Sequence, residues 1–331
     1  MKTTDALLPL YPVMRKYGVT CSPEEFHHSV NLAFHDAESQ VYDDIHSCMW
    51  KSLPQQVEFL VGDCFKAGAL SGSSLAALDI GCGTGLASEL LLRTPVASKI
   101  SSLDMLDTSP EMLNRARARS SSWSVKPDFL NAEVADLRAQ PRRYDVVIVC
   151  SVLHHIPDLP TFLSDVRSLL APGAVFLHLQ DPNGDYLEDP ELKSRMSDLQ
   201  RHQVKIPSWI RRLNPNRVMR KIRRAIVHDK NDSYLNSVSN ALIASGVTRQ
   251  PMSPEDLWSV TDIHVHDGEG ISIKEMASFP WRCRLVSQRS YSFFGKMLTE
   301  LPPAYRLRES ALIEQRALNG LHVSAAWVAV E

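Results

Sequence analysis

The sequence lacks the long apolar run that a membrane span requires. No stretch reaches about eighteen uninterrupted apolar residues, and the opening residues MKTTDALLPLYPVMRKYG have neither the apolar core nor the small-residue cleavage site of a secretory signal. With 44% hydrophobic residues, the chain has the composition of a globular protein that buries a large core. These absences predict a cytoplasmic protein.

Cysteine is scarce and scattered. The six cysteines form no C-x-x-C pair, which argues against a zinc knuckle, a redox pair or a disulfide scaffold. We therefore expect reduced thiols.

Neither sign of charge dominates the chain, because its formal net charge is -2. The near balance hides one basic run, with seven lysines and arginines between Arg211 and Arg224 and no acid among them. This composition predicts a basic amphipathic helix over 208–228. Two interpretations lead, a lid that shows its charges to water or a peripheral contact with an anionic membrane or an acidic acceptor, and contact with nucleic acid is the less favoured alternative.

Short apolar runs and helical patterns alternate between residues 75 and 180. Strands are expected at 75–81, 99–106, 128–134, 144–153 and 174–181, and helices at 86–94, 109–119 and 161–173. Ser109 is a predicted helix cap, and Pro172 with Gly173 is a predicted helix end. Such alternation predicts an α/β fold with an open, doubly wound and mostly parallel sheet.

Three glycines follow the first of these strands in LDIGCGTG, residues 78–85. Gly81, Gly83 and Gly85 permit a sharp turn and the close approach of a ligand, at the sheet edge where doubly wound folds bind their ligands. A dinucleotide favours G-x-G-x-x-G, whereas the spacing here is G-x-G-x-G. Asp79 before the loop disfavours a pyrophosphate and favours a cationic ligand.

Four segments together resemble the class I S-adenosylmethionine-dependent methyltransferases of small molecules. They are LDIGCGTG, LDMLDTSPEML, AEVADL and YDVVIVCSVLHHIPD, in that order along residues 78–158. The resemblance implies a Rossmann-like, seven-stranded sheet whose last strand is antiparallel. It also implies S-adenosylmethionine as cofactor, and it disfavours base methylation of nucleic acid because no N-P-P-Y-like tetrapeptide follows the fourth strand.

The resemblance assigns cofactor contacts along these motifs. It implies that Asp107 binds the ribose, with Asp104 as the competing acid, and that Asp136 reaches the adenine. Tyr42, with Asp43, resembles a Y-D step that closes over the cofactor. The predicted cofactor-binding residues are Tyr42, Asp79, Gly81, Gly83, Gly85, Asp107, Thr108, Asp136, Leu137 and Cys150.

Histidines are the candidates for proton transfer if the acceptor is a hydroxyl. His154 and His155 follow the fourth strand, and a packing role for this pair is the alternative to catalysis. His35 and His46 recur with Glu38 and Tyr42 at helical spacing, on a face expected to turn toward a pocket. The catalytic candidates are therefore His154, as first choice, with His155, His35 and His46.

Metal-binding patterns are incomplete, and no metal ion is expected. His264, His266 and Asp267 alternate along one segment but lack a clear further partner, so a substrate-contact loop is the simpler interpretation. DPNGD, residues 181–185, begins like a calcium loop but lacks its later glycine and glutamate.

The predicted organisation has four parts. Residues 1–70 form a helical lid, 71–181 the cofactor-binding core, 182–255 a helical cap insertion that sets specificity, and 256–331 the end of the core with its last two strands. The expected activity is O-methylation of a small or lipid-like acceptor with a histidine base. N-methylation, a non-methylating use of the cofactor pocket and a nicotinamide-dependent oxidoreductase are the alternatives.

Overall fold

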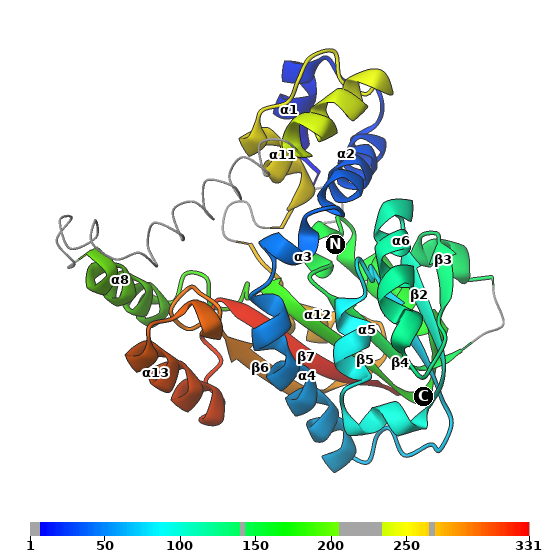
Figure 1. Ribbon diagram of the computed structural model, residues 1–331, viewed down its shortest axis with the longest axis vertical. Helices are drawn as coiled ribbons and strands as arrows, with labels where there is room; N and C mark the ends of the chain where they lie inside the picture. Colours follow the sequence, from blue (N-terminus) through cyan, green and yellow to red (C-terminus); the bar gives the residue numbers. More distant parts are fainter. Residues whose placement is uncertain (1–6, 140–142, 205–233, 265–268, 331) are drawn as a thin grey trace.

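A seven-stranded mixed sheet forms the centre of the molecule (Figure 1). A computed structural model describes residues 7–139, 143–204, 234–264 and 269–330. The strand order is β3-β2-β1-β4-β5-β7-β6, and β7 runs antiparallel to both of its neighbours. The strands are β1 Leu75–Ile80, β2 Ile100–Asp107, β3 Asp128–Asn131, β4 Tyr144–Cys150, β5 Leu170–Pro182, β6 Cys283–Tyr291 and β7 His322–Ala329. The predicted Rossmann-like fold is confirmed.

Helices cover both faces of this sheet. Helices α4 (Met49–Lys66), α5 (Leu86–Leu91) and α6 (Pro110–Arg119) pack on one face, and α7 (Leu159–Leu169) and α12 (Ile273–Ser278) pack on the other. A hydrophobic core lies on each face of the sheet, and strand β4 contributes to both. Val146 and Ile148 belong to the core beneath α4, α5 and α6, while Val147 and Val149 belong to the core beneath α7 and α12. The period of two along a strand explains why this segment is apolar throughout.

Helix boundaries follow local capping signals. The Ser109 hydroxyl accepts a hydrogen bond from the Met112 amide and begins α6, as predicted. Helix α7 was expected to end at Pro172 and Gly173, but it ends at Leu169. The next residue, Leu170, is already extended and begins β5, so the proline and glycine lie within the start of the strand.

A third helical cluster stands beyond the carboxyl ends of the strands (Figure 1). It consists of α1 (Leu10–Tyr17), α2 (Pro23–Glu38), residues 234–244 and α11 (Pro254–Thr261). Helix α3 (Tyr42–Ile45) follows α2, and α4 then packs against the sheet. The predicted lid of residues 1–70 thus contains one helix of the sheet layer.

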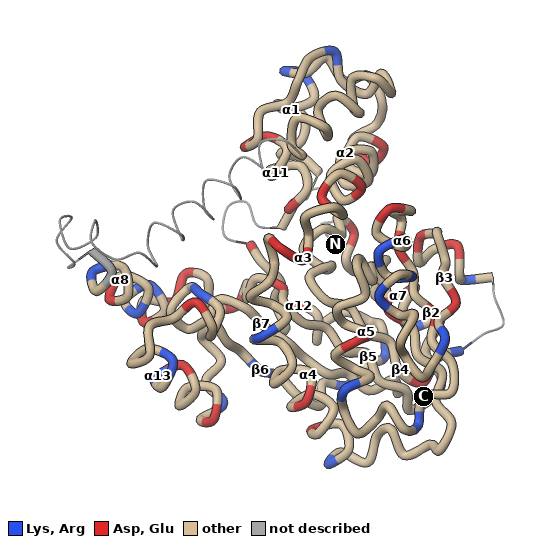
Figure 2. Tube along the Cα trace, viewed as in Figure 1, with Lys and Arg blue, Asp and Glu red and all other residues tan. Residues whose placement is uncertain are grey.

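The inserted segment 182–255 begins away from this cluster. Helix α8 (Pro190–Val204) lies beside α13 (Pro303–Glu314), where the Tyr305 hydroxyl donates to the Asp198 carboxylate at 3.1 Å. Both helices carry acidic and basic residues (Figure 2). The predicted basic helix over 208–228 lies outside the described residues. Within the described ranges, no helix combines the length and apolarity needed to cross a membrane.

Candidate active site

A cavity of about 680 Å³ opens where the carboxyl ends of β1, β2 and β4 meet α2 and α3. Ligands of doubly wound sheets bind at this edge. Its lining includes, from the strand ends, Gly81, Gly83, Asp107, Thr108, Glu133, Val134, Ser151 and His155, and from the helices above them His27, His28, Asn31, His35 and Tyr42. The cavity therefore joins motif residues of the sheet to a histidine-rich face of α2.

Asp107 is the carboxylate at the end of β2 that reaches the cavity. Its two oxygens accept hydrogen bonds from the backbone amides of Gly83 and Ser109, both at 2.8 Å. Burial raises the pKa of Asp107, although these two amides oppose the shift. The competing Asp104 is buried under the sheet edge and accepts a hydrogen bond from the Tyr144 hydroxyl at 2.6 Å. Geometry thus favours Asp107 as the ribose ligand.

The glycine loop leaves room for a ligand at one position in particular. Gly83 has φ +51°, and an added Cβ would meet no atom within 4 Å. At Gly81, with φ +62°, a Cβ would lie 2.6 Å from Cγ2 of Val152. Both glycines line the cavity, whereas Gly85 has φ +92° and caps α5 below it.

Asp79 lies under the loop rather than in the cavity wall. It is fully buried, and its Oδ2 accepts hydrogen bonds from the Ser88 hydroxyl at 2.6 Å and the Ser88 amide at 3.0 Å. Burial raises the pKa of Asp79 to about 7. Its Oδ1 is buried and has no hydrogen-bond partner among the described residues.

Glu133 and Val134 line the cavity at the place predicted for Asp136 and Leu137. Asp136 is exposed, and its carboxylate accepts from the Glu133 amide at 2.9 Å, while Leu137 is buried in the core beneath α7. The cavity lining thus includes Glu133 and Val134 but not Asp136 or Leu137, whose predicted contact with the adenine stays a prediction. Cys150, at the end of β4, is half-buried, and burial raises the pKa of its thiol well above the ordinary value.

Glu38 joins two of the candidate histidines. Its carboxylate lies 3.4 Å from His35 Nδ1 and 3.0 Å from His46 Nε2, although the helix breaks between α2 and α3. Burial opposes the charged form of Glu38, but the two histidines lower its pKa to about 2. Burial likewise lowers the pKa of His35, but Glu38 and nearby carboxylates outweigh it and raise that pKa above its ordinary value. Tyr42 lines the cavity beside this group.

His154 and His155 take different positions after β4. His154 is buried, and its Nδ1 lies 2.9 Å from the Asp181 carboxylate. His155 lines the cavity, donates from Nδ1 to the Thr261 carbonyl at 2.8 Å and stacks edge-on with His35 at 5.3 Å between ring centroids. Burial lowers the pKa of His155 well below its ordinary value. His155 and His35 thus face one another in the cavity wall.

The two metal-like patterns noted in the sequence, DPNGD and the segment around His264, form hydrogen bonds with other parts of the chain. In DPNGD, Asp181 binds His154, the Asn183 amide donates to the carbonyls of Leu318 and Gly320, and Asp185 accepts from the Ile273 amide at the start of α12. His264 Nε2 lies 2.7 Å from the Ile156 carbonyl. His266 and Asp267 lie outside the described residues.

Comparison with known proteins finds methyltransferase relatives for the central part of the chain. Residues 78–176 match a family model described as a methyltransferase domain. A ubiquinone biosynthesis O-methyltransferase of Xanthomonas campestris is 37% identical over 106 residues, 32% of this chain and 41% of that protein. The highly reducing polyketide synthase otaA of Aspergillus carbonarius is 27% identical over 199 residues, 56% of this chain and 7% of that protein. The chain thus spans less than half the length of either relative.

Among solved structures, the plantazolicin methyltransferase BpumL in complex with SAH is 13% identical, with a TM-score of 0.47, over 93% of this chain and 97% of that chain. The family match covers the glycine loop, Asp107, Glu133 and His155, and it stops within β5. The open space at Gly83 and the Asp107 carboxylate in the same cavity fit the cofactor of that family. Residues 78–176 are therefore similar to a methyltransferase domain, as the four motifs predict.

Proposed function

We propose that this chain transfers the methyl group of S-adenosylmethionine to a hydroxyl of a small-molecule acceptor, with His35 as the proton acceptor. The observation that carries the proposal is that His35 and Asp107 line one cavity, from α2 and from β2 respectively. A bound cofactor supplies an activated methyl carbon. The protein has to hold the acceptor in line with that carbon and to exclude water.

His35 has the properties of a general base. With Nδ1–H directed at Glu38, its Nε2 is left to accept a proton. The buried Glu38 carboxylate then stabilises the imidazolium that forms. The raised pKa of His35 also makes its imidazole a stronger base. His154, the first choice from sequence, is not among the residues that line the cavity.

Asp107 would hold the ribose hydroxyls, because an ionised carboxylate accepts two hydrogen bonds from a diol. The open side of Gly83 would receive the adjoining part of the cofactor, and Glu133 with Val134 would contact the adenine. Tyr42 and α2 form the wall opposite the strand ends, so we propose that this wall carries acceptor specificity together with the described part of the insertion.

Methyl transfer is tested with methyl-labelled S-adenosylmethionine and fractionated cell extract. We expect one fraction to take up the label, and mass spectrometry of the product to place it on oxygen. Label on nitrogen or carbon would contradict O-methylation but not the family. Failure of the pure protein to bind S-adenosylmethionine in calorimetry would contradict the whole proposal.

Peripheral attachment to an anionic membrane through 208–228 stays a prediction. Each basic side chain near such a surface contributes about 1 kcal/mol. Flotation with anionic vesicles at low salt tests it, using a variant in which Arg220, Lys221, Arg223 and Arg224 become glutamine. If neither protein binds the vesicles, or if both bind them equally, the membrane contact is contradicted and the lid interpretation is favoured.

A further inference from the structure

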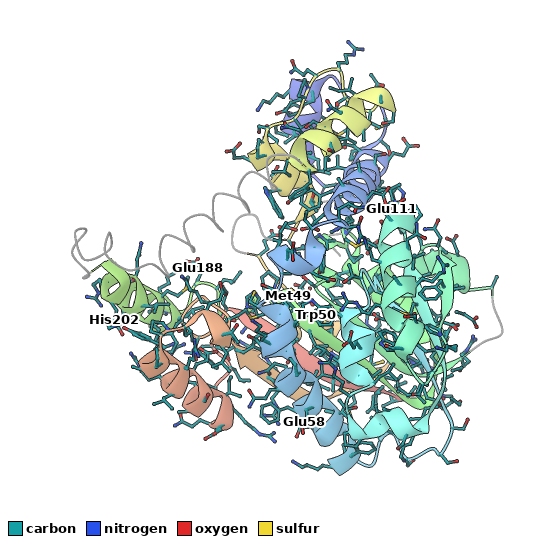
Figure 3. All side chains as sticks on the ribbon, in the orientation of Figure 1. Met49, Trp50, Glu58, Glu111, Glu188 and His202 are labelled. Carbon is teal, nitrogen blue, oxygen red and sulfur yellow. The ribbon has the colours of Figure 1, made fainter. Side chains whose placement is uncertain are left out.

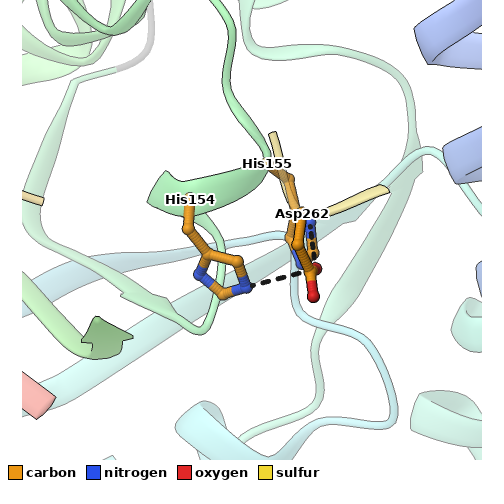
Figure 4. A group of neighbouring side chains, drawn as sticks. All are labelled: His154, His155 and Asp262. Atoms are coloured by element: carbon orange, nitrogen blue, oxygen red, sulfur yellow. Dashed lines mark ion pairs between the residues drawn. The ribbon is translucent and has the colours of Figure 1, made fainter. Parts of the chain in front are cut away.

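Three side chains from two distant segments converge beside the cavity (Figure 4). His154 and His155 belong to the 3-10 turn Leu153–His155, and Asp262 follows α11. The Asp262 carboxylate lies 3.4 Å from His155 Nδ1 and 3.8 Å from His154 Nε2. One ligand atom from each residue lies within 4.8 Å of the others. Metal–ligand bonds of about 2.0–2.2 Å separate neighbouring ligand atoms by roughly 3 to 3.5 Å, so small side-chain movements would enclose an ion.

Asp181 fixes the orientation of one of these imidazoles. Its Oδ1 lies 2.9 Å from His154 Nδ1 and also accepts from the His154 backbone amide at 3.3 Å. Asp181 is fully buried, and its Oδ2 lies 3.6 Å from Nδ1 of the buried His178. A carboxylate that binds one ring nitrogen leaves the other nitrogen as a lone-pair donor, which is the usual arrangement behind a metal-bound histidine. His154 Nε2 is the nitrogen that faces Asp262.

Backbone contacts hold the two segments in this register. The His264 amide donates to the His154 carbonyl at 3.1 Å, and His264 Nε2 lies 2.7 Å from the Ile156 carbonyl. His155 Nδ1 donates to the Thr261 carbonyl at 2.8 Å. These contacts, made by the residues on either side of Asp262, hold its backbone next to the histidine pair.

We propose that His154, His155 and Asp262 bind a divalent transition-metal ion, with Zn²⁺ preferred over Mg²⁺. Imidazole ligands suit zinc, whereas magnesium favours sites made of oxygen. Binding through His155 Nδ1 needs the tautomer protonated at Nε2, so the proton moves from Nδ1 to Nε2 and the hydrogen bond to the Thr261 carbonyl is given up. Three side-chain ligands leave the fourth tetrahedral position to a water molecule or an acceptor oxygen, as in catalytic zinc sites, and of the three ligands His155 lines the cavity.

The role of the ion rests on the proposed methyl transfer. His155 lines the cavity and lies 5.3 Å from His35 between ring centroids. An oxygen-bearing acceptor bound at the fourth position would thus come within reach of the proposed base. The ion would orient the acceptor and lower the pKa of its hydroxyl as a Lewis acid.

The test uses tag-free protein that has been treated with a chelator, in the absence of cofactor and acceptor. Calorimetry with Zn²⁺ and visible absorption with Co²⁺ should show one bound equivalent, with no thiolate charge-transfer band and no binding of Mg²⁺. Asp262→Asn and His154→Gln should abolish this binding. Asp181→Asn, which keeps all three ligands, should weaken it about 10- to 100-fold.

His202→Gln is the matched control, because it removes an imidazole on α8, far from the cluster (Figure 3). Wild type that binds no Zn²⁺, or Asp262→Asn and wild type that bind it equally, would overturn the proposal. A thiolate band would assign the ion to cysteine and would overturn it as well. Because binding is measured without cofactor, a failure of methyl transfer by the zinc-loaded protein would contradict the proposed function instead.

Discussion

The Asp107 carboxylate accepts a hydrogen bond from the Gly83 amide at 2.8 Å, so the end of β2 holds the loop that follows β1. The same carboxylate lines the cavity. The Asp107 side chain therefore fixes the conformation of the glycine loop and also lies in the wall of the cavity next to that loop.

Asp107→Ala should weaken S-adenosylmethionine binding by about 2 kcal/mol, or roughly 30-fold, because hydrogen bonds to a charged group are lost. Calorimetry measures the change. Glu111→Gln is the control, since Glu111 is an exposed acid in the first turn of α6 (Figure 3). Equal affinities of all three proteins would exclude Asp107 from the cofactor site.

Comparing Gly83→Ala with Gly173→Ala distinguishes two effects of an added methyl group, strain in the backbone and loss of space for a ligand. Both glycines have positive φ, +51° and +75°, and neither would place a Cβ within 4 Å of another atom. Each substitution should lower the free energy of unfolding by about 1 kcal/mol. Only Gly83→Ala should also weaken cofactor binding, because only Gly83 lines the cavity. Cofactor affinities that fall equally in both variants would show that the effect is global.

Glu133→Gln should weaken cofactor binding more than Asp136→Asn does. Both acids are exposed, but Glu133 lines the cavity, whereas Asp136 does not and caps its own short turn. Parallel calorimetric titrations of the two variants decide the assignment. A larger loss of cofactor affinity in Asp136→Asn would support Asp136 as the adenine contact, as the sequence motif predicts.

His35→Gln should lower kcat by about two to four orders of magnitude while cofactor affinity stays nearly constant. In wild type, kcat should fall as the pH drops below the raised pKa of His35, because the base becomes protonated. Glu38→Gln removes the carboxylate that raises this pKa, so the acidic limb of the profile should move to lower pH. An unmoved limb would mean that another group accepts the proton.

Glu38 also makes the stability of the protein depend on pH. Its pKa falls from an ordinary 4.5 to about 2 on folding, so its stabilising contribution is complete above pH 4.5 and is lost as the pH falls toward 2. The raised pKa of His35 gives a contribution that is complete below its ordinary value of 6.5 and is lost as the pH rises through the folded pKa.

The difference in unfolding free energy between wild type and Glu38→Gln should therefore be largest between pH 4.5 and 6.5. Thermal or urea unfolding across that range measures it. Glu58→Gln on α4 is the control, because Glu58 is an exposed carboxylate (Figure 3). A difference that does not vary with pH would show that Glu38 is not charged against its two histidines.

The glycine loop and the strand ends that line the cavity could largely be predicted from sequence, because their signals are local. A glycine loop after a strand, an acid at the end of the next strand and a capped helix behind it lie within about thirty residues, from Leu78 to Ser109. The short turn after β3 is less readable, because it has two acids and only the backbone path decides that Glu133 rather than Asp136 lines the cavity.

The sequence by itself determined the sheet, its family motifs and a list of histidines, since periodicity and turn chemistry act over neighbouring residues. Tertiary structure decided what each histidine does. Glu38 meets His35 and His46 only because the chain bends between α2 and α3, and Asp262 meets His154 only because backbone hydrogen bonds join segments more than a hundred residues apart. Contacts of that kind depend on packing across the whole fold, which no local pattern encodes.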